Sequence, residues 1–370
     1  MEKRGTAILP LHYGHPPEYL YRRMVKLGGI ICDLISEKFG SETLLEKMSD
    51  PFWFHSLSLA IGFDWNSSGT TTATLSALKE YYSSGKGDIS IIGGKGKKMG
   101  NVKDELKIAE INGFTDDSHL SQIYSTSKRV ARIDQNLLQD SYDLYLHFII
   151  LDGKHRWSII QQGLNSESRL ARRYHWSWAS KKDFLNDGRS GLSGFQQNKS
   201  ILDLSTSVSE NNRKAMLEVI RENPQKFYFN ITRERQRTLD SFRESSSENQ
   251  RVLNMDYRID WNRMRELYEY QPSDFQSLMD FRGVGKSTLR SLSYLAEIIY
   301  GEPPSYEDPV KYSFALGGKD GVPKPVNTHD YDIAIEFYNE VLSGTPERKI
   351  VMEKLSRSLA EYSFSRTNSR

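Results

Sequence analysis

The stretch LYLHFIILDGKHRWSIIQQG, residues Leu144–Gly163, decides the fold class of this chain. Two runs rich in aliphatic and aromatic residues, Leu144–Leu151 and Trp157–Gln162, flank a turn that contains Asp152-Gly153. An Asp-Gly turn between two such runs is typical of a β-hairpin. The sequence therefore predicts two antiparallel strands in the N-terminal half.

Helical and extended patterns surround this hairpin. Apolar residues recur at helical spacing in several segments, and a short β-branched run stops at a pair of glycines. The expected elements are helices over Leu20–Phe39, Thr70–Tyr82 and Ser127–Leu138 and a strand over Asp88–Ile92. This mixture predicts an α/β or α+β N-terminal domain whose mixed sheet contains the hairpin.

The composition limits the classes of function. The 370 residues suffice for two or three domains, and 37% hydrophobic content allows a packed core. Fifty basic residues against 48 acidic ones give a net charge of +2, which excludes a wholly cationic binder but allows local basic patches. No apolar run is long enough for a membrane span or a secretory signal. Cys32, the only cysteine, excludes an internal disulfide. We expect a soluble, cytoplasmic protein without a membrane partner.

The sequence divides into three zones. Residues 1–205 form the predicted α/β domain, which we interpret as catalytic. Residues 206–265 have many alternating charges and few apolar clusters, which predicts a charged helical linker. Residues 266–370 are predicted to be an all-α DNA-binding domain.

The segment DFQSLMDFRGVGKSTLRSLSYLAEIIYG, Asp274–Gly301, has the pattern of a helix-hairpin-helix. Glycines in the tight turn allow a close approach to phosphate, and the amides that begin the second helix face outward as donors. The residues expected to contact DNA are Gly283, Val284, Gly285, Lys286, Ser287 and Arg290. Such a motif binds the phosphate backbone without reading base sequence. The alternative is an ordinary pair of packed helices.

A second constellation lies between Ser127 and Trp176. Nucleases of the restriction-enzyme fold hold Mg²⁺ or Mn²⁺ with an acid at a strand end, an acid or Gln on the next strand and a helix acid. The candidate metal ligands are Asp140, Asp143 and Gln161, and the helix acid is Asp134. The pattern departs from these nucleases at Gly163, where a lysine is expected. A structural hairpin with buried polar ends is the alternative.

Basic clusters indicate further nucleic-acid contacts. Arg172 and Arg173 are suited to clamping phosphates, and His175 to protonating a leaving oxygen or binding a metal. Lys95 and Lys97 belong to a glycine-rich cationic loop that is suited to holding a DNA backbone. The alternatives are a partly exposed face with snorkelling arginines and an ordinary solvated loop.

Two histidine-containing motifs allow other interpretations. His12 and His15, with Asp64, are compatible with a metal site, although such pairs are more often hydrogen-bonded within loops. The segment Asp152–Arg156, DGKHR, is similar to the signature of partition-type nucleases. Because it falls on the predicted hairpin turn, we interpret it as a turn.

Several stretches together resemble the archaeal and bacterial family catalogued as domain of unknown function 763. They are LPLHYGHPP (9–17), SDPFWFHSLSLAIGFDWNSSGTTT (49–72), GGKGK (93–97), QQGLN (161–165), ARRYHW (171–176) and FALGGKDGVPKPV (314–326). The resemblance implies a DNA-associated protein of unsettled activity. The chain departs from the family pattern at His55, at Asn66 and at Lys286-Ser287 in the hairpin.

Three functions remain open at this point. The first is a metal-dependent, sequence-nonspecific nuclease of DNA repair or processing. The second is a non-catalytic DNA-binding scaffold whose partner is a second copy or another repair protein. The third is a DNA glycosylase or abasic-site lyase, for which Lys286 stands one residue early and Asp330 or Asp332 would supply the acid.

Overall fold

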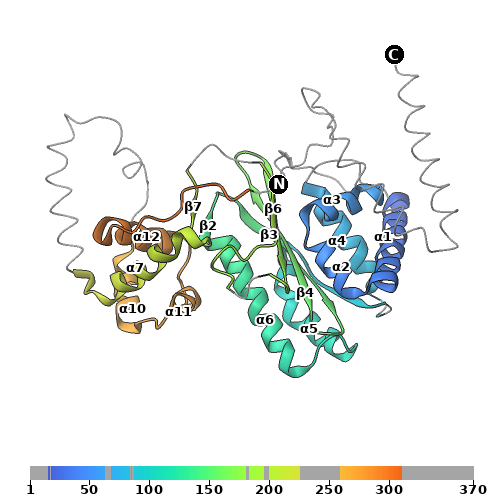
Figure 1. Ribbon diagram of the computed structural model, residues 1–370, viewed down its shortest axis with the longest axis horizontal. Helices are drawn as coiled ribbons and strands as arrows, with labels where there is room; N and C mark the ends of the chain where they lie inside the picture. Colours follow the sequence, from blue (N-terminus) through green and yellow to red (C-terminus); the bar gives the residue numbers. More distant parts are fainter. Residues whose placement is uncertain are drawn as a thin grey trace, which may run out of the picture.

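The fold is taken from a computed structural model, shown in Figure 1. The structure describes residues 16, 18–62, 68–83, 85, 87–180, 183–195, 200–225 and 259–310. Within these residues, no helix is both long and apolar enough to cross a membrane.

A five-stranded sheet with the order β1-β3-β4-β5-β6 forms the centre of the molecule. Its strands are β1 (Ile89–Lys95), β3 (Asp143–Asp152), β4 (Trp157–Asn165), β5 (Leu170–Ser177) and β6 (Gly191–Ser193). All four pairings are antiparallel, so the fold is α+β and the prediction of a mixed sheet is wrong. The predicted hairpin is confirmed as β3 and β4, joined across the Asp-Gly turn.

Helices cover both faces of this sheet. Because successive side chains of a strand point to opposite faces, Leu146 and Phe148 pack against one helical layer and Ile149 and Leu151 against the other. The first layer, blue in Figure 1, contains α1 (Glu18–Phe39), α2 (Ser41–Met48), α3 (Pro51–Ala60) and α4 (Ser68–Tyr82). The second contains α5 (Val102–Ile111) and α6 (Asp117–Arg132). Burial on both faces explains the unbroken apolar run of β3.

The C-terminal helices extend the second layer. They are α7 (Glu210–Arg221), α10 (Trp261–Tyr270), α11 (Phe275–Asp280) and α12 (Lys286–Tyr300). Their apolar side chains belong to the same core cluster as Ile149 and Trp176 of the sheet. Part of the predicted linker, α7, is therefore packed into the core, where Met216 is fully buried. Residues 226–258 of that linker lie outside the described residues.

The helix predicted over Ser127–Leu138 begins ten residues earlier than expected. Asp116 caps α6 by accepting a hydrogen bond from the His119 amide. The helix ends in a π-helical turn, Ile133–Leu137, which leads into the short strand β2 (Leu138–Gln139). β2 pairs with β7 (Leu202–Asp203), and this small ribbon lies beside the main sheet. The other three predicted elements are confirmed as α1, α4 and β1.

Candidate functional site

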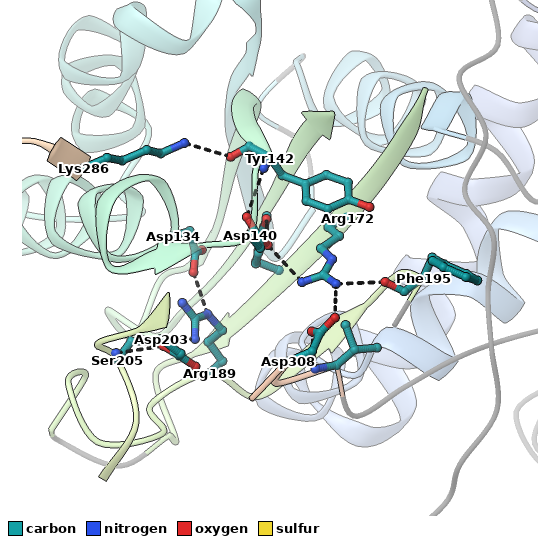
Figure 2. A network of polar contacts seen from close by, with 12 residues as sticks. Asp134, Asp140, Tyr142, Arg172, Arg189, Phe195, Asp203, Ser205, Lys286 and Asp308 are labelled. Carbon is teal, nitrogen blue, oxygen red and sulfur yellow. Dashed lines mark hydrogen bonds and ion pairs between the residues drawn. The ribbon is translucent and has the colours of Figure 1, made fainter. Parts of the chain in front are cut away.

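The predicted acids Asp134 and Asp140 lie in a buried polar network, shown in Figure 2. Asp134 belongs to the π-helical turn after α6, and Asp140 directly follows β2. Strand β5 passes both acids and supplies Arg172, while Arg189 precedes β6. We call the three aspartates Asp134, Asp140 and Asp308 and the two arginines Arg172 and Arg189 the buried ion network.

Asp140 and Arg172 form the first half of the network. Their side chains are fully buried, and Arg172 Nη1 lies 3.1 Å from Asp140 Oδ2. The same guanidinium donates to Asp308 and, at 2.9 Å, to the carbonyl of Phe195. Asp140 also accepts hydrogen bonds from the Tyr142 amide and, at 3.1 Å, from the Tyr174 hydroxyl. These donors occupy both oxygens of the Asp140 carboxylate.

Asp134 forms the second half. Arg189 Nε donates to it at 2.6 Å and Trp176 Nε1 at 2.8 Å, and the amide of Gln161 is a third donor. The Gln161 carbonyl oxygen in turn lies 2.8 Å from Nδ1 of His147. The sequence patterns did not single out Arg189 or Asp308, because both lie in irregular segments without a recognisable motif.

Burial dominates the protonation of these groups. It raises the pKa of Asp134 to about 6, although the Arg189 charge acts in the opposite direction. It also raises the pKa of Asp140 despite the charge of Arg172. Burial alone would lower the pKa of Arg172, but Asp140 and Asp308 together raise it, so this cation stays charged.

The predicted Mg²⁺ or Mn²⁺ ligands do not converge. Gln161 faces Asp134, and Asp140 faces Arg172, whereas the side chain of Asp143 is 77% exposed and lies 2.6 Å from Lys286 Nζ. The three predicted ligands therefore do not share one centre, and the oxygens of Asp134 and Asp140 accept hydrogen bonds from protein donors. Among the described residues, the group of three side chains that is close enough together to hold a metal ion lies in another part of the fold.

Gly163, at the position where these nucleases have a lysine, is tightly enclosed. A Cβ atom there would lie 2.9 Å from Cβ of Tyr142 and 3.1 Å from the Tyr174 hydroxyl. A longer side chain does not fit between these two tyrosines. The departure from the nuclease pattern therefore has a packing cause.

Arg172, Arg173 and His175 are not surface residues. All three are fully buried: Arg173 and His175 lie under the helices of the first layer, whereas Arg172 is enclosed by the non-helical segments that contain Asp140, Phe195 and Asp308. Arg173 donates from Nε to His175 at 2.9 Å, and from its terminal nitrogens to the Thr71 hydroxyl and the Pro51 carbonyl. Burial, together with the Arg173 charge, lowers the pKa of His175 well below its usual value. These positions correct the expectation of direct DNA contacts and of a histidine general acid.

The hairpin between α11 and α12 has the local geometry that the sequence indicates. Gly283 has a φ of +89°, and Val284 is anchored in the core with 8% exposure. Ser287 faces solvent. Lys286 and Arg290 are engaged within the chain, because Lys286 pairs with Asp143 and Arg290 donates to Gln139 at 2.6 Å. Both side chains hold α12 against the corner between β2 and β3.

The glycine-rich loop remains a candidate contact. Lys95 and Lys97 are both exposed, and Lys95 Nζ lies 5.7 Å from the centre of the Tyr145 ring. The possible ligands His12, His15 and Asp64 lie outside the described residues.

The fold and the network define an α+β protein whose antiparallel sheet is covered by helices on both faces. The chain belongs to the family described as "Protein of unknown function (DUF763)", which it matches over residues 5–326. The match includes both the buried ion network and the hairpin. No curated protein matches the chain, and no solved structure matches it.

Proposed function

We propose that this protein binds the phosphate backbone of DNA through the turn between α11 and α12, without preference for base sequence. The observation that supports this proposal is a set of unsatisfied donors. Within the described residues, the backbone amides of Gly285, Lys286, Ser287 and Thr288 have no acceptor, and no side chain caps α12. Such amides, with the positive end of the helix dipole, favour an anion.

Access to these amides supports the same conclusion. A Cβ atom at Gly285 would meet no atom within 4 Å, so the space beside the turn is open. Gly283 gives the turn its left-handed backbone conformation, which other residues adopt at a cost. Arg282 and Ser287 are exposed on either side of the turn. A phosphate oxygen therefore has a route to several donors at once.

The charges predict a modest electrostatic contribution. Lys286 and Arg290 already have partners in the chain, so Arg282 is the exposed cation of the turn. If this one exposed cation neutralises roughly one phosphate, the slope of log K against log salt on duplex DNA is about −1. We therefore expect binding that is measurable at low salt and weak at physiological salt.

Metal-dependent cleavage of DNA stays a hypothesis, and the buried ion network does not support it, because its predicted ligands do not converge and its acids accept hydrogen bonds from protein donors. The scaffold hypothesis needs only the hairpin. The lyase hypothesis requires a free lysine nucleophile, whereas Lys286 Nζ donates to Asp143. Asp330 and Asp332 lie outside the described residues.

Fluorescence anisotropy with labelled duplex and single-stranded DNA tests the proposal. Gly285→Leu places a side chain in the open space beside the turn, and Ser287→Glu adds a negative charge that suits a helix N-terminus but repels phosphate. We expect each substitution to weaken binding about tenfold or more, which corresponds to about 1.4 kcal/mol or more. Ile111→Glu, at a remote side chain that is 83% exposed, is the charge-matched control.

The same samples test catalysis. Incubation with EDTA, Mg²⁺ or Mn²⁺, followed by gel analysis, separates a nuclease from a scaffold. If both hairpin variants retain wild-type affinity, the proposed binding surface is wrong. Binding without cleavage in every metal supports the scaffold hypothesis.

A further inference from the structure

Three potential metal ligands meet where α6 begins beside the turn of the β3–β4 hairpin. They are Asp116, His119 and His155, whose ligand atoms all lie within 4.8 Å of one another. Among the described residues, three or more His, Cys, Asp or Glu side chains have ligand atoms this close together in this group. It lies apart from the buried ion network and has no role in the proposed contact with DNA.

The helix cap positions the carboxylate. Asp116 Oδ1 accepts the His119 amide at 2.9 Å, as an N-cap residue does. The other oxygen, Oδ2, lies 2.9 Å from His119 Nδ1 and 3.4 Å from His155 Nε2. Hydrogen bonds from Ser118 and His119 lower the pKa of Asp116, so the carboxylate is ionised. His119 Nδ1 also lies 2.9 Å from Oδ1, so both carboxylate oxygens face this imidazole, and Oδ2 faces His155 as well.

The hairpin turn fixes the third side chain. Asp152, which is fully buried, accepts the amides of Lys154 at 2.9 Å and Arg156 at 3.0 Å. The Arg156 guanidinium donates to the same carboxylate at 2.7 Å. His155 between them has a φ of +61°, which few side chains other than Asn, Asp and His adopt. The DGKHR segment is thus a closed turn that presents His155 towards α6.

We propose that Asp116, His119 and His155 bind one divalent first-row transition metal ion of the Zn²⁺ type. Two imidazoles and one carboxylate suit Zn²⁺, Co²⁺ or Ni²⁺, whereas Mg²⁺ prefers oxygen ligands. Ligand atoms at about 2.1 Å from such an ion lie roughly 3.0–3.4 Å apart in octahedral or tetrahedral sites. The two separations from Asp116 Oδ2, 2.9 and 3.4 Å, agree with these values.

Binding requires a small movement of one ring. The two imidazoles are stacked, with centroids 3.7 Å apart and planes 5° from parallel, so their lone pairs do not yet converge on one point. The side chains are 40% and 34% exposed, which leaves room for one ring to tilt. Three protein ligands leave the remaining coordination positions to water. The distal Nδ1 of His155 has no hydrogen-bond partner among the described residues, so this ligand lacks the outer-shell hydrogen bond that strengthens metal binding.

The experiment uses the full-length protein after treatment with a chelator and dialysis. Isothermal titration with Zn²⁺ gives the stoichiometry, and visible absorption of bound Co²⁺ reports its coordination. Asp116→Asn keeps the helix cap but removes the anionic ligand, and His155→Asn keeps a residue that tolerates the left-handed backbone. Asp117→Asn removes the adjacent exposed carboxylate and is the matched control.

We expect one Zn²⁺ per chain in the wild type, affinity about tenfold or more weaker in Asp116→Asn and His155→Asn, and no change in Asp117→Asn. Mg²⁺ in excess should not displace Zn²⁺. Because protons compete with metals for imidazole nitrogens, affinity should fall as the pH is lowered. Absence of stoichiometric binding would overturn the proposal. So would equal affinity in the wild type and both site variants, because the ion would then bind elsewhere on the chain.

Discussion

Replacing Arg172 with Met separates a structural role of this arginine from a role in binding DNA. The guanidinium is fully buried and donates to Asp140, Asp308 and the Phe195 carbonyl. A methionine fills much of the same volume but supplies no charge and no donor. The substitution therefore leaves two buried carboxylates without their cation.

The expected loss of stability follows from the two carboxylates that lose their cation. Breaking a buried ion pair by removing one partner costs about 3–5 kcal/mol, and the upper part of this range applies because two acids lose their partner. Domains have a free energy of unfolding of about 5–15 kcal/mol, so the variant should remain folded only with a small margin. The melting temperature should fall by on the order of 10 °C. Because the unpaired acids become neutral when they bind protons, the loss should be smaller in acid than at neutral pH.

Chemical denaturation and DNA-binding anisotropy on the same preparations provide the assay. Arg221→Met removes a surface cation whose side chain is 52% exposed and serves as the control, with an expected change within about 0.5 kcal/mol. Arg172→Met combined with Asp140→Asn should recover part of the lost stability. If Arg172→Met unfolds like the wild type but lowers the salt slope of DNA binding by about one, the arginine contacts phosphate and the buried network is wrong.

Two further predictions concern the same region. The pKa of Asp134 is raised from 3.8 to about 6, so the native state holds this proton more tightly and stability falls as the pH rises from about 4 to 6. A shift of this size corresponds to about 3 kcal/mol. Urea denaturation should show that the stability advantage of the wild type over Asp134→Asn shrinks between about pH 4 and 6. An advantage that grows with pH would contradict the raised pKa of Asp134. Gly163→Ala should destabilise the protein by about 1–3 kcal/mol because its Cβ collides with Tyr142, and a thermal melt indistinguishable from wild type would show that the site relaxes.

The sheet was predictable because its signal is local. Strands β3 and β4 lie next to each other in sequence, and the Asp-Gly turn between them fixes their direction. The antiparallel arrangement of the whole sheet was not predictable, because β1 pairs with β3 across more than forty intervening residues. The start of α6 was missed because its cap, Asp116, lies well before Ser127, where the helix was expected to begin.

The site was predictable only in part. Gln161 donates to Asp134 and Arg172 donates to Asp140, so these candidate residues lie in one region, but not as the shared metal site that the sequence predicts. Their roles differ from the prediction because burial depends on the distant segments that pack over the strand and not on the strand itself. Arg172 and Arg173 are neighbours on β5 and therefore point to opposite faces, where each meets its own set of partners. A local sequence cannot show that both faces are covered.

The use of arginines inside the protein also changes how its charge should be interpreted. The sequence has 50 basic and 48 acidic residues, but not all of the basic residues are available to a ligand. Arg172, Arg173 and Arg189 are buried and hydrogen-bonded within the chain. Lys286, which the hairpin pattern assigns to DNA, is neutralised by Asp143 from the sheet. In the proposed contact with DNA, the turn would therefore attract phosphate mainly with backbone amides, whose contribution depends little on released counterions. A steep salt dependence would point to other lysines and arginines as the binding surface, and a shallow one to the hairpin.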